Sequence, residues 1–307
     1  MAYEIKEFPQ LSWSFSRMKM LQECPRKYYY NYYGYHNGWL REAGEESKHI
    51  YRLKNLQPID AFFGQKFHEA VTGIVKERKK ELLEPDKFRR SINRMIKEAY
   101  HESKTLLEDW RIHPKWYAMI SEVYYEGDIT QEKKDSIIKK INITSENIFL
   151  SKSFKELTEN DVEIIELDEL KSFEINGLTA YLKIDALYRV GEKYVLVDWK
   201  TSARDDSLTD VDQLILYSWY ANNVLGIRLE DLEARLEFVQ LEKMEKYQFS
   251  NSDLSLIDRR IDKDLKQIQS FLLDPEINQP LPKEKFFQTK GSSLCKYCNF
   301  REICWRG

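Results

Sequence analysis

The chain has 307 residues, of which 32% are charged, and its 48 basic and 51 acidic side chains leave a formal net charge of −3. This length accommodates one large domain with a substantial core, which we expect to span residues 1–307. The charge balance excludes a globally basic nucleic-acid-binding protein, although an acidic site can mask a local basic groove. No segment is apolar over the length of a membrane span, and the first ten residues lack the apolar centre of a signal peptide. We therefore expect a cytoplasmic protein.

The first part of the chain is expected to be largely helical. Residues 11–33 begin with serines that can cap a helix, and Pro25 can open a second helical segment because a first turn tolerates its missing N–H. Residues 34–60 contain glycines and mixed charges, and we interpret them as an irregular link. His68 lies in a predicted helix over 61–83, where a lone histidine is more often structural than a metal ligand. The buried face of this helix is predicted to consist of Phe63, Phe67, Ala70, Val71 and Ile74.

The remainder predicts a sheet with further helices. Residues 84–160 are charged and helical in pattern, and we expect them to form a helical insertion. Residues 162–175 alternate like a strand and lead into Asn176-Gly177, a strong hairpin-turn signal. Apolar runs at 178–190 and 193–200 complete a three-stranded antiparallel meander. After it we expect a helix over 211–226, a strand over 232–243, a charged helix over 252–273, a proline-rich link and a cysteine-rich tail. This order of elements predicts a mixed α/β protein.

Two acidic residues are expected to face each other in the hairpin formed by residues 178–190 and 193–200. Gly191 suits the first position of a two-residue turn, and the resulting register places Asp185 directly opposite Asp198, with Cβ atoms roughly 5 Å apart. Like charges in these positions destabilise a sheet unless something compensates them. A divalent cation is the simplest compensation, because such cations prefer carboxylate oxygens.

Lys200 adds an ammonium to this pair, because it is two residues beyond Asp198 and therefore on the same strand face. An Asp-x-Lys sequence is common by chance, and on a solvated strand it forms an exposed ion pair of little value. Here it follows Val195, Leu196 and Val197, an apolar run typical of a buried central strand, where unpaired charges are costly. We therefore interpret the two carboxylates and the ammonium as a metal-dependent active site.

Four cysteines form a second group. Cys24 stands alone near the start, whereas Cys295, Cys298 and Cys304 lie close together in CKYCNFREIC. A disulfide framework is not expected in a cytoplasmic chain. Four thiolates with a C-x-x-C core are typical of a metal site that holds either zinc or an iron–sulfur cluster. The alternative is four unrelated buried thiols.

Six segments, taken together, resemble a known family. They read SFSRMKMLQECPRKYYY, GQKFHEAV, LKIDALY, VLVDWKTS, QLILY and CKYCNFREIC, and they occur in the family's order. The family is the RecB-like branch of the PD-(D/E)XK nucleases that carry an iron–sulfur cluster, which includes AddB-type nuclease domains and CRISPR-adaptation exonucleases. The resemblance covers both ends and the centre of the chain, and residues 84–160 only loosely. It implies a restriction-endonuclease-like core, in which a central mixed sheet with an antiparallel meander is flanked by helices.

The resemblance also implies a role for each matching residue. His68, Asp185 and Asp198 would bind one Mg²⁺ or Mn²⁺ ion, helped by the backbone carbonyl of Trp199. Lys200 would orient or activate the attacking water and stabilise charge on the phosphate. These roles agree with what phosphodiester hydrolysis requires, namely a deprotonated water and neutralisation of the developing charge.

Two further features follow from the resemblance. Gln213 and Tyr217, one helical turn apart, would match a Gln-x-x-x-Tyr motif that supports the site and contacts the substrate. One departure is visible, because the family often has glycine three residues before the motif aspartate, where this chain has Leu182.

A [4Fe–4S] cluster would join residues 1–33 to residues 282–307, and because the tail has few apolar residues we expect its order to depend on that cluster. Its ligands would be Cys24, Cys295, Cys298 and Cys304.

The implied function is a divalent-metal-dependent DNA nuclease, acting as an exonuclease on single-stranded DNA or DNA ends. One alternative is a non-catalytic DNA-binding or structural subunit of a larger complex, but a dead copy has no reason to keep His68, Asp185, Asp198 and Lys200. A third interpretation is a zinc-bearing accessory protein. The chain has no Gly-x-x-x-x-Gly-Lys-Ser/Thr motif, so a helicase or an integrase-type protein is the expected protein partner, and no membrane contact is expected.

Overall fold

The computed structural model describes residues 5–77, 83–159, 161–203, 207–289 and 293–304. At its centre lies a mixed sheet in the order β1-β3-β4-β5-β6, with β2 paired to β3. β2, β3 and β4 form the predicted antiparallel meander, β4 and β5 are parallel, and β6 is antiparallel to β5. The strands are β1 (Ser12–Trp13), β2 (Glu163–Ile175), β3 (Leu178–Val190), β4 (Lys193–Lys200), β5 (Leu232–Phe238) and β6 (Lys243–Tyr247). The expected fold class, a restriction-endonuclease-like mixed sheet flanked by helices, is confirmed.

The hairpin between β3 and β4 has the register predicted from the sequence. Val190 pairs with Lys193, and the pairing continues to Ala186 opposite Val197. Gly191 has a φ of +60°, which the first position of such a turn favours. Ala186 and Val197 are the last described pair of this ladder.

β4 pairs with the second half of β3, and β1 pairs with the first half. It pairs in parallel with Thr179 and Ala180, whereas β2 pairs along the opposite edge of β3 over its whole length. β4 and β1 are therefore neighbours of β3 on the same edge, and the edge between them begins at Asp185. The candidate site lies at this gap, where β3 pairs with neither β1 nor β4.

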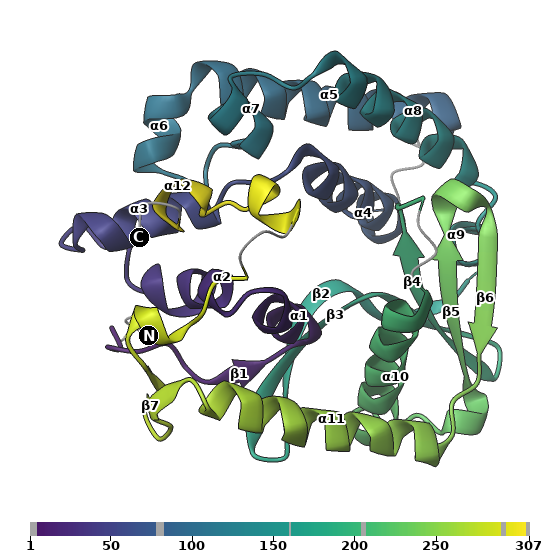
Figure 1. Ribbon diagram of the computed structural model, residues 1–307. Coiled ribbons are helices and arrows are strands. Elements are labelled where there is room, and N and C mark those ends of the chain that lie inside the picture. Colours follow the sequence, from purple (N-terminus) through teal and green to yellow (C-terminus); the bar gives the residue numbers. More distant parts are fainter. Residues whose placement is uncertain (1–4, 78–82, 160, 204–206, 290–292, 305–307) are drawn as a thin grey trace.

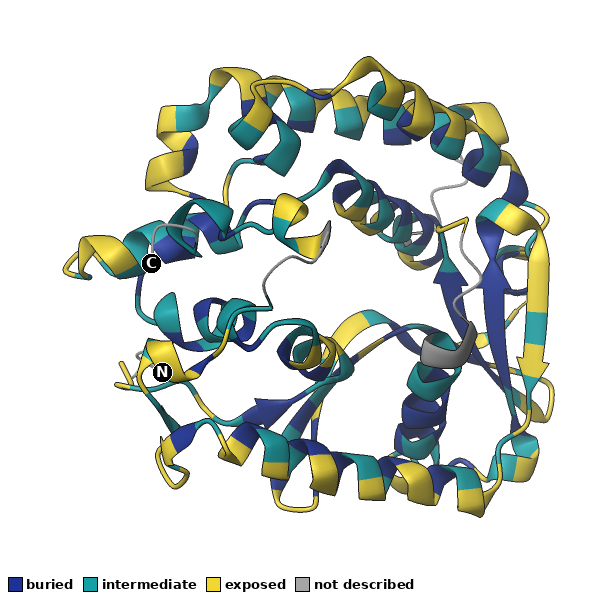
Figure 2. Cartoon of the chain, in the orientation of Figure 1, coloured by how far each residue is buried: buried dark blue, intermediate teal, exposed yellow. Residues whose placement is uncertain are grey.

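Helices cover both faces of the sheet (Figure 1). On one face, Val195, Val197 and Trp199 of β4 pack against α4 (Ile59–Glu77), α5 (Pro85–Thr105), α8 (Gln131–Asn147) and α9 (Lys152–Glu159). On the other face, Leu196 of β4 packs with α1 (Phe15–Glu23), α10 (Ser207–Asn223) and α11 (Asn251–Gln269). Figure 2 shows β4 and β5 as largely buried strands between these helical layers. The apolar run predicted to be a buried central strand is both central and buried.

The N-terminal segment contains the predicted helices and one strand. After β1, the Oγ of Ser14 accepts a 3.3 Å hydrogen bond from the N–H of Arg17 and caps α1, as expected for a serine-rich start. Pro25 opens α2 (Pro25–Tyr29), as predicted. A π-helical turn, Tyr30–Gly34, follows directly.

The interpretation of residues 34–60 as an irregular link was wrong. They contain α3 (Glu45–Lys54) and the start of α4. Acidic side chains in the first turn of α3 and basic ones in the last turn complement the helix dipole. In the sequence this arrangement looked like a mixture of charges and was not interpreted as a helix. Ile50 and Leu53 of α3 enter a third core cluster together with Trp110 and Phe300.

Other boundaries differ in detail from the predictions. Residues 84–160 are helical as expected, with α6 (Leu107–Ile112) and α7 (Ser121–Glu126) between α5 and α8. The strand predicted over 232–243 ends at Phe238 because a 3₁₀ turn, Val239–Leu241, follows it. The helix predicted over 252–273 ends at Gln269, and a small hairpin of β7 (Leu272–Asp274) and β8 (Gln279–Pro280) comes next. Residues 78–82, at the end of the helix predicted over 61–83, lie outside the described residues.

The tail has more apolar support than its composition predicted. It contains two 3₁₀ turns, Lys283–Lys285 and Ser293–Tyr297, and α12 (Arg301–Cys304). Phe286 and Phe300 are 0% and 1% exposed. Phe286 packs on Phe271 with ring centroids 4.8 Å apart, and Phe300 packs on Tyr30 at 5.2 Å. No helix in the described part of the chain is both long and apolar enough to cross a bilayer.

Candidate active site

Asp185 lies where β3 and β4 separate. Its Oδ2 accepts a 2.7 Å hydrogen bond from the main-chain N–H of Trp199. Asp185 and Asp198 would be the next pair in register after Ala186 and Val197, but they lie one step beyond the last paired residues. The two aspartates are therefore linked through the Trp199 backbone instead of facing each other across an intact ladder.

His68 approaches this point from α4. A Cβ built on Gly64, one turn earlier, would lie 3.5 Å from Thr201 Oγ1, so this helix passes close to the residue that follows β4. His68 Nδ1 lies 3.2 Å from Asp185 Oδ1. Burial acts to lower the pKa of His68, but Asp185, assisted by Asp198, outweighs it and raises that pKa. The carboxylate thereby favours the protonated form of the imidazole.

The two aspartates have opposite pKa shifts. Burial acts to raise the pKa of Asp185, but the His68 charge, a hydrogen bond from His68 and the Trp199 N–H outweigh it and hold the pKa below its ordinary value. Burial raises the pKa of Asp198 to about 6, because Lys200 only partly offsets the lost hydration and Asp185 adds a like charge. Two neighbouring carboxyls with divergent pKa values are typical of functional sites.

Asp198 has an oxygen that the protein does not fully satisfy. The residue is 4% exposed, and Lys200 Nζ lies 2.7 Å from its Oδ2. This ammonium is the ion-pair partner of the oxygen, and the part of the chain that the structure describes offers it no further hydrogen-bond donor. Burial acts to lower the pKa of Lys200, but Asp198 outweighs it and raises that pKa.

Residues of α10 connect Lys200 to the backbone of β3. Lys200 Nζ donates to Gln213 Oε1 at 3.1 Å, and Gln213 Nε2 donates to the hydroxyl of Tyr217. The Tyr217 hydroxyl donates in turn to the Lys183 carbonyl at 2.7 Å. The predicted sharing of a helix face by Gln213 and Tyr217 is confirmed, and their polar groups fix the position of the ammonium relative to β3.

Two acidic residues of the site were missed by the sequence analysis. Asp210 Oδ1, at the start of α10, lies 3.4 Å from Lys200 Nζ. Asp168 of β2 falls opposite Asp185 in the register, has a φ of +50° and binds Lys183 Nζ at 2.7 Å. The only signal for Asp210 was its position one turn before Gln213. The backbone distortion at Asp168 left no sequence signal.

The donor set fits a hard divalent cation chemically. Carboxylate oxygens from Asp185 and Asp198, with an imidazole nitrogen from His68, are typical ligands of Mg²⁺ or Mn²⁺. Oδ2 of Asp198 is buried, its partner is the Lys200 ammonium, and a bound cation would add a second positive charge at this carboxylate. No group of three or more His, Cys, Asp and Glu side chains in the described part of the chain is already arranged around a metal position. The ion pairs of Asp185 with His68 and of Asp198 with Lys200 supply the positive charge instead.

Residues 23–26, which include Cys24, lie against residues 286–289 of the tail. The N–H and Nε of Arg26 donate to the carbonyls of Phe287 and Phe286 at 3.2 and 2.9 Å, and Thr289 Oγ1 donates to the Glu23 carbonyl at 2.8 Å. Burial raises the pKa values of the Cys298 and Cys304 thiols, with smaller contributions from other cysteines. The predicted cluster ligands are Cys24, Cys295, Cys298 and Cys304; none is in a disulfide, and they do not form a ready-made metal site among the described residues.

Comparison with known proteins identifies the family. The model of the PD-(D/E)XK nuclease superfamily matches residues 12–305. The chain belongs to the PD-(D/E)XK nuclease superfamily. A solved structure described as "Crystal structure of SSO0001" is similar at 21% sequence identity, with 60% of this chain and 79% of that chain covered and a TM-score of 0.29. No curated protein matches the chain at a significant level.

Proposed function

We propose that this PD-(D/E)XK protein is a divalent-metal-dependent DNA nuclease that hydrolyses phosphodiester bonds in single-stranded DNA or at DNA ends. The observation that carries the proposal is the junction of β3 and β4, where His68, Asp185, Asp198 and Lys200 meet. Superfamily membership supports a metal-dependent nuclease. The DNA substrate and exonucleolytic action are part of the proposal.

Each residue has a chemical task in such a reaction. Asp185, Asp198 and His68 would hold the cation, with the Trp199 carbonyl as a further ligand. The bound cation would acidify a water molecule and neutralise charge on the phosphate. Lys200, held by Gln213 and Asp210, places an ammonium where it can orient the water and stabilise the developing negative charge.

The test is digestion of end-labelled single-stranded, duplex and circular DNA with EDTA, Mg²⁺ or Mn²⁺. The proposal expects shortening of linear single strands only when a divalent cation is present, and intact circles if ends are required. Cleavage of circles would replace the exonuclease by an endonuclease. DNA binding without cleavage under all metal conditions would favour the alternative, a non-catalytic subunit of a helicase–nuclease or CRISPR-adaptation type complex.

We also propose the RecB-like, iron–sulfur branch of the superfamily for this chain. The approach of the two termini supports it, since Arg26 and Glu23 beside Cys24 bind residues 286–289 of the tail. Four thiolates with a C-x-x-C core can bind a [4Fe–4S] cluster. Anaerobically purified protein should be brown with about four irons per chain, and Cys298→Ala should be colourless. Stoichiometric zinc and no iron in such a preparation would contradict this part of the proposal.

A further inference from the structure

Three cations lie near one another in the part of the chain that the structure describes. They are Arg17 on α1, Lys54 at the end of α3 and Lys115 between α6 and α7. Within the described ranges, none of the three forms an ion pair with a carboxylate; Arg17 Nη1 donates to the Ser12 carbonyl at 3.3 Å and Lys54 Nζ to the Asn31 carbonyl at 3.0 Å. Burial, with Arg17 and Lys115 nearby, lowers the pKa of Lys54 to about 7. Like charges gathered without compensation favour an anion that binds between them.

Aromatic rings alternate with two of these cations. The guanidinium carbon of Arg17 lies 4.3 Å from the ring centroid of Tyr32 and 6.0 Å from that of Tyr181. Lys54 Nζ lies 5.7 Å from the Tyr32 centroid and 3.3 Å from that of Tyr35. The resulting row runs from Tyr181 through Arg17, Tyr32 and Lys54 to Tyr35. The rings hold the cations in place without neutralising them.

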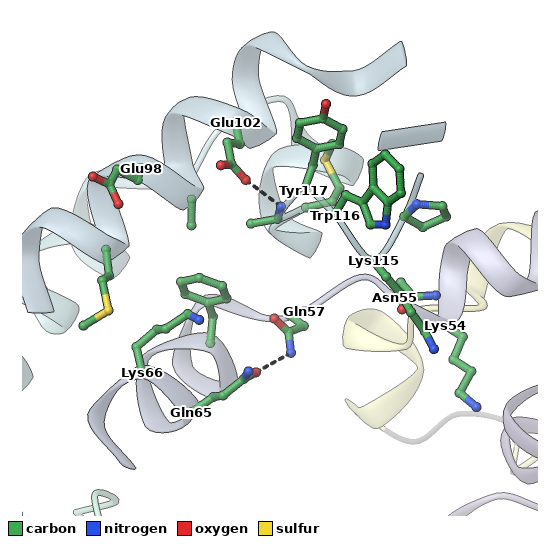
Figure 3. Close-up of a pocket in the computed structure, with 16 residues that line it drawn as sticks. Lys54, Asn55, Gln57, Gln65, Lys66, Glu98, Glu102, Lys115, Trp116 and Tyr117 are labelled. Atoms are coloured by element: carbon green, nitrogen blue, oxygen red, sulfur yellow. Dashed lines mark hydrogen bonds between the residues drawn. The ribbon is translucent and has the colours of Figure 1, made fainter. Parts of the chain in front are cut away.

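Lys54 and Lys115 also line a cavity of about 450 Å³, whose opposite wall carries the carboxylates of Glu98 and Glu102 (Figure 3). Trp116, next to Lys115 on the wall of this cavity, is 74% exposed. One face of its indole stacks on His113, with centroids 4.0 Å apart and planes at 14°. An exposed aromatic ring that a neighbour already holds in place is suited to stacking with a base.

The row and the cavity each include one residue on an element that also carries a residue of the candidate site. Tyr181 is four residues before Asp185 on β3, which is roughly 13 Å along an extended strand. Gln65 lines the cavity and lies one helical turn before His68 on α4. A strand bound along these residues would therefore lead toward the two carboxylates.

We propose that Arg17, Lys54 and Lys115 bind successive phosphates of a DNA single strand on its way to the candidate active site, and that Trp116 stacks on one of its bases. This inference deepens the proposed nuclease function and rests on it. Cations that follow a backbone, interleaved with aromatic faces, are the general pattern of single-strand binding. A duplex is a poorer fit, because its bases are stacked on one another and do not offer their faces to Trp116.

The test measures binding of tetramethylrhodamine-labelled dT20 by anisotropy at pH 6, below the lowered pKa of Lys54, with EDTA present so that metal-dependent cleavage cannot occur. Each cation that contacts a phosphate contributes about 0.7 to the slope of log K against log salt concentration. Arg17→Gln, Lys54→Gln and Lys115→Gln should each reduce that slope by about 0.7. Lys139→Gln, at an exposed site on α8, is the matched control and should leave the slope unchanged.

One conservative variant and one exposed site separate the effect of charge from the effect of misfolding. Lys54→Arg keeps the charge and should keep the wild-type slope. Lys115 is exposed, so Lys115→Gln tests the inference even if the Lys54 and Arg17 variants are unstable. Trp116→Ala should weaken binding roughly 5- to 150-fold without changing the slope, whereas Trp116→Phe should retain most of the affinity.

The outcomes distinguish this inference from the function on which it rests. Suppose that the wild type binds and cleaves DNA, but that Lys115→Gln keeps the wild-type salt slope and Trp116→Ala keeps the wild-type affinity. The proposed path for single-stranded DNA is then wrong, and the nuclease proposal stands. Equal affinity of the wild type for duplex and single-stranded DNA would also overturn the proposed path for single-stranded DNA. A wild type that neither binds dT20 nor cleaves it with Mn²⁺ would remove both proposals.

Discussion

The main-chain N–H of Trp199 donates a 2.7 Å hydrogen bond to Asp185, at the point where β3 and β4 stop pairing. The Asp185 carboxylate thus accepts a main-chain hydrogen bond where the strand ladder ends, and its pKa is lowered. Asp198, next to Trp199 in the sequence, is buried beside the Lys200 ammonium, and its pKa is raised. The same short stretch of backbone therefore sets the positions of both carboxylates. The two carboxylates therefore lie close together in different environments, and their replacement should have different effects.

Replacing the two aspartates should have opposite effects on the stability of the metal-free protein. Asp198 ionises in a site that raises its pKa to about 6 from an ordinary value of 3.8, so Asp198→Asn should stabilise the fold by about 1–3 kcal/mol at pH 7.5. Asp185 has a lowered pKa, so Asp185→Asn should destabilise it, because His68 loses its partner. Urea denaturation in EDTA measures both changes, and equal effects of the two variants would contradict the assignment.

The pH dependence of this stability has a defined sign. A carboxyl with a raised folded-state pKa contributes stability that is complete below its unfolded value, near 3.8, and is lost as pH rises through about 6. The stability of the wild type relative to Asp198→Asn should therefore fall between about pH 4 and pH 6.5. A difference that is constant over this range would show that Asp198 is not perturbed by burial.

Metal affinity should rise with pH. Binding requires a deprotonated Asp198, whose pKa is about 6, and a neutral His68, whose pKa is raised. Calorimetric titration with Mn²⁺ should therefore show stronger binding at pH 8 than at pH 5.5, with protons released on binding. An affinity that does not change over this interval would exclude these two residues as ligands.

Asp210 should support catalysis by holding Lys200. Asp210→Asn removes a carboxylate 3.4 Å from the ammonium, so we expect kcat to fall by roughly 10-fold, or about 1.4 kcal/mol, with the Mn²⁺ affinity unchanged. Asp212→Asn is the control, because Asp212 is on the same helix but pairs with Arg260. A loss of Mn²⁺ affinity in the Asp210 variant would instead make this residue a metal ligand.

The tail should depend on Phe300 as well as on the cysteines. Phe300 is 1% exposed and packs on Tyr30, so Phe300→Ala should destabilise the protein by about 3–5 kcal/mol. Cys24→Ala should abolish the iron–sulfur colour and lower the melting temperature, yet leave part of the tail resistant to proteolysis, since Phe286 and Phe300 remain packed. A tail that is completely digested in the Cys24 variant would show that the aromatic anchors are not sufficient.

The hairpin at the centre of the site was predictable because several local signals agree there. Alternating apolar residues, a glycine in the turn and the buried run before Asp198 define one register, and Ala186 pairs with Val197 as that register requires. The charged strand β6 was missed because it lies at the edge of the sheet, where lysine and glutamate side chains remain solvated. Edge strands of this kind carry little of the alternation on which strand prediction depends.

Other features required tertiary information. Beyond Ala186, β4 no longer pairs with β3, and the next described partner on that edge is β1, a two-residue strand from a distant part of the sequence. Asp168 reaches the site through a backbone distortion with positive φ, and α3 is buried by contacts with Trp110 and Phe300 that are distant in sequence. Local periodicity contains no information about any of these contacts.

The central claim is that Asp185, Asp198 and His68 bind the cation while Lys200 acts on the reaction. One pair of measurements on the same samples tests it: Mn²⁺ affinity by calorimetry and cleavage of an end-labelled single strand in Mn²⁺. We predict that Lys200→Ala retains Mn²⁺ binding and loses about 10²–10⁴-fold in cleavage rate, whereas Asp198→Ala loses both. Cleavage at the wild-type rate by either variant, or loss of Mn²⁺ binding in Lys200→Ala with retention in Asp198→Ala, would contradict the account.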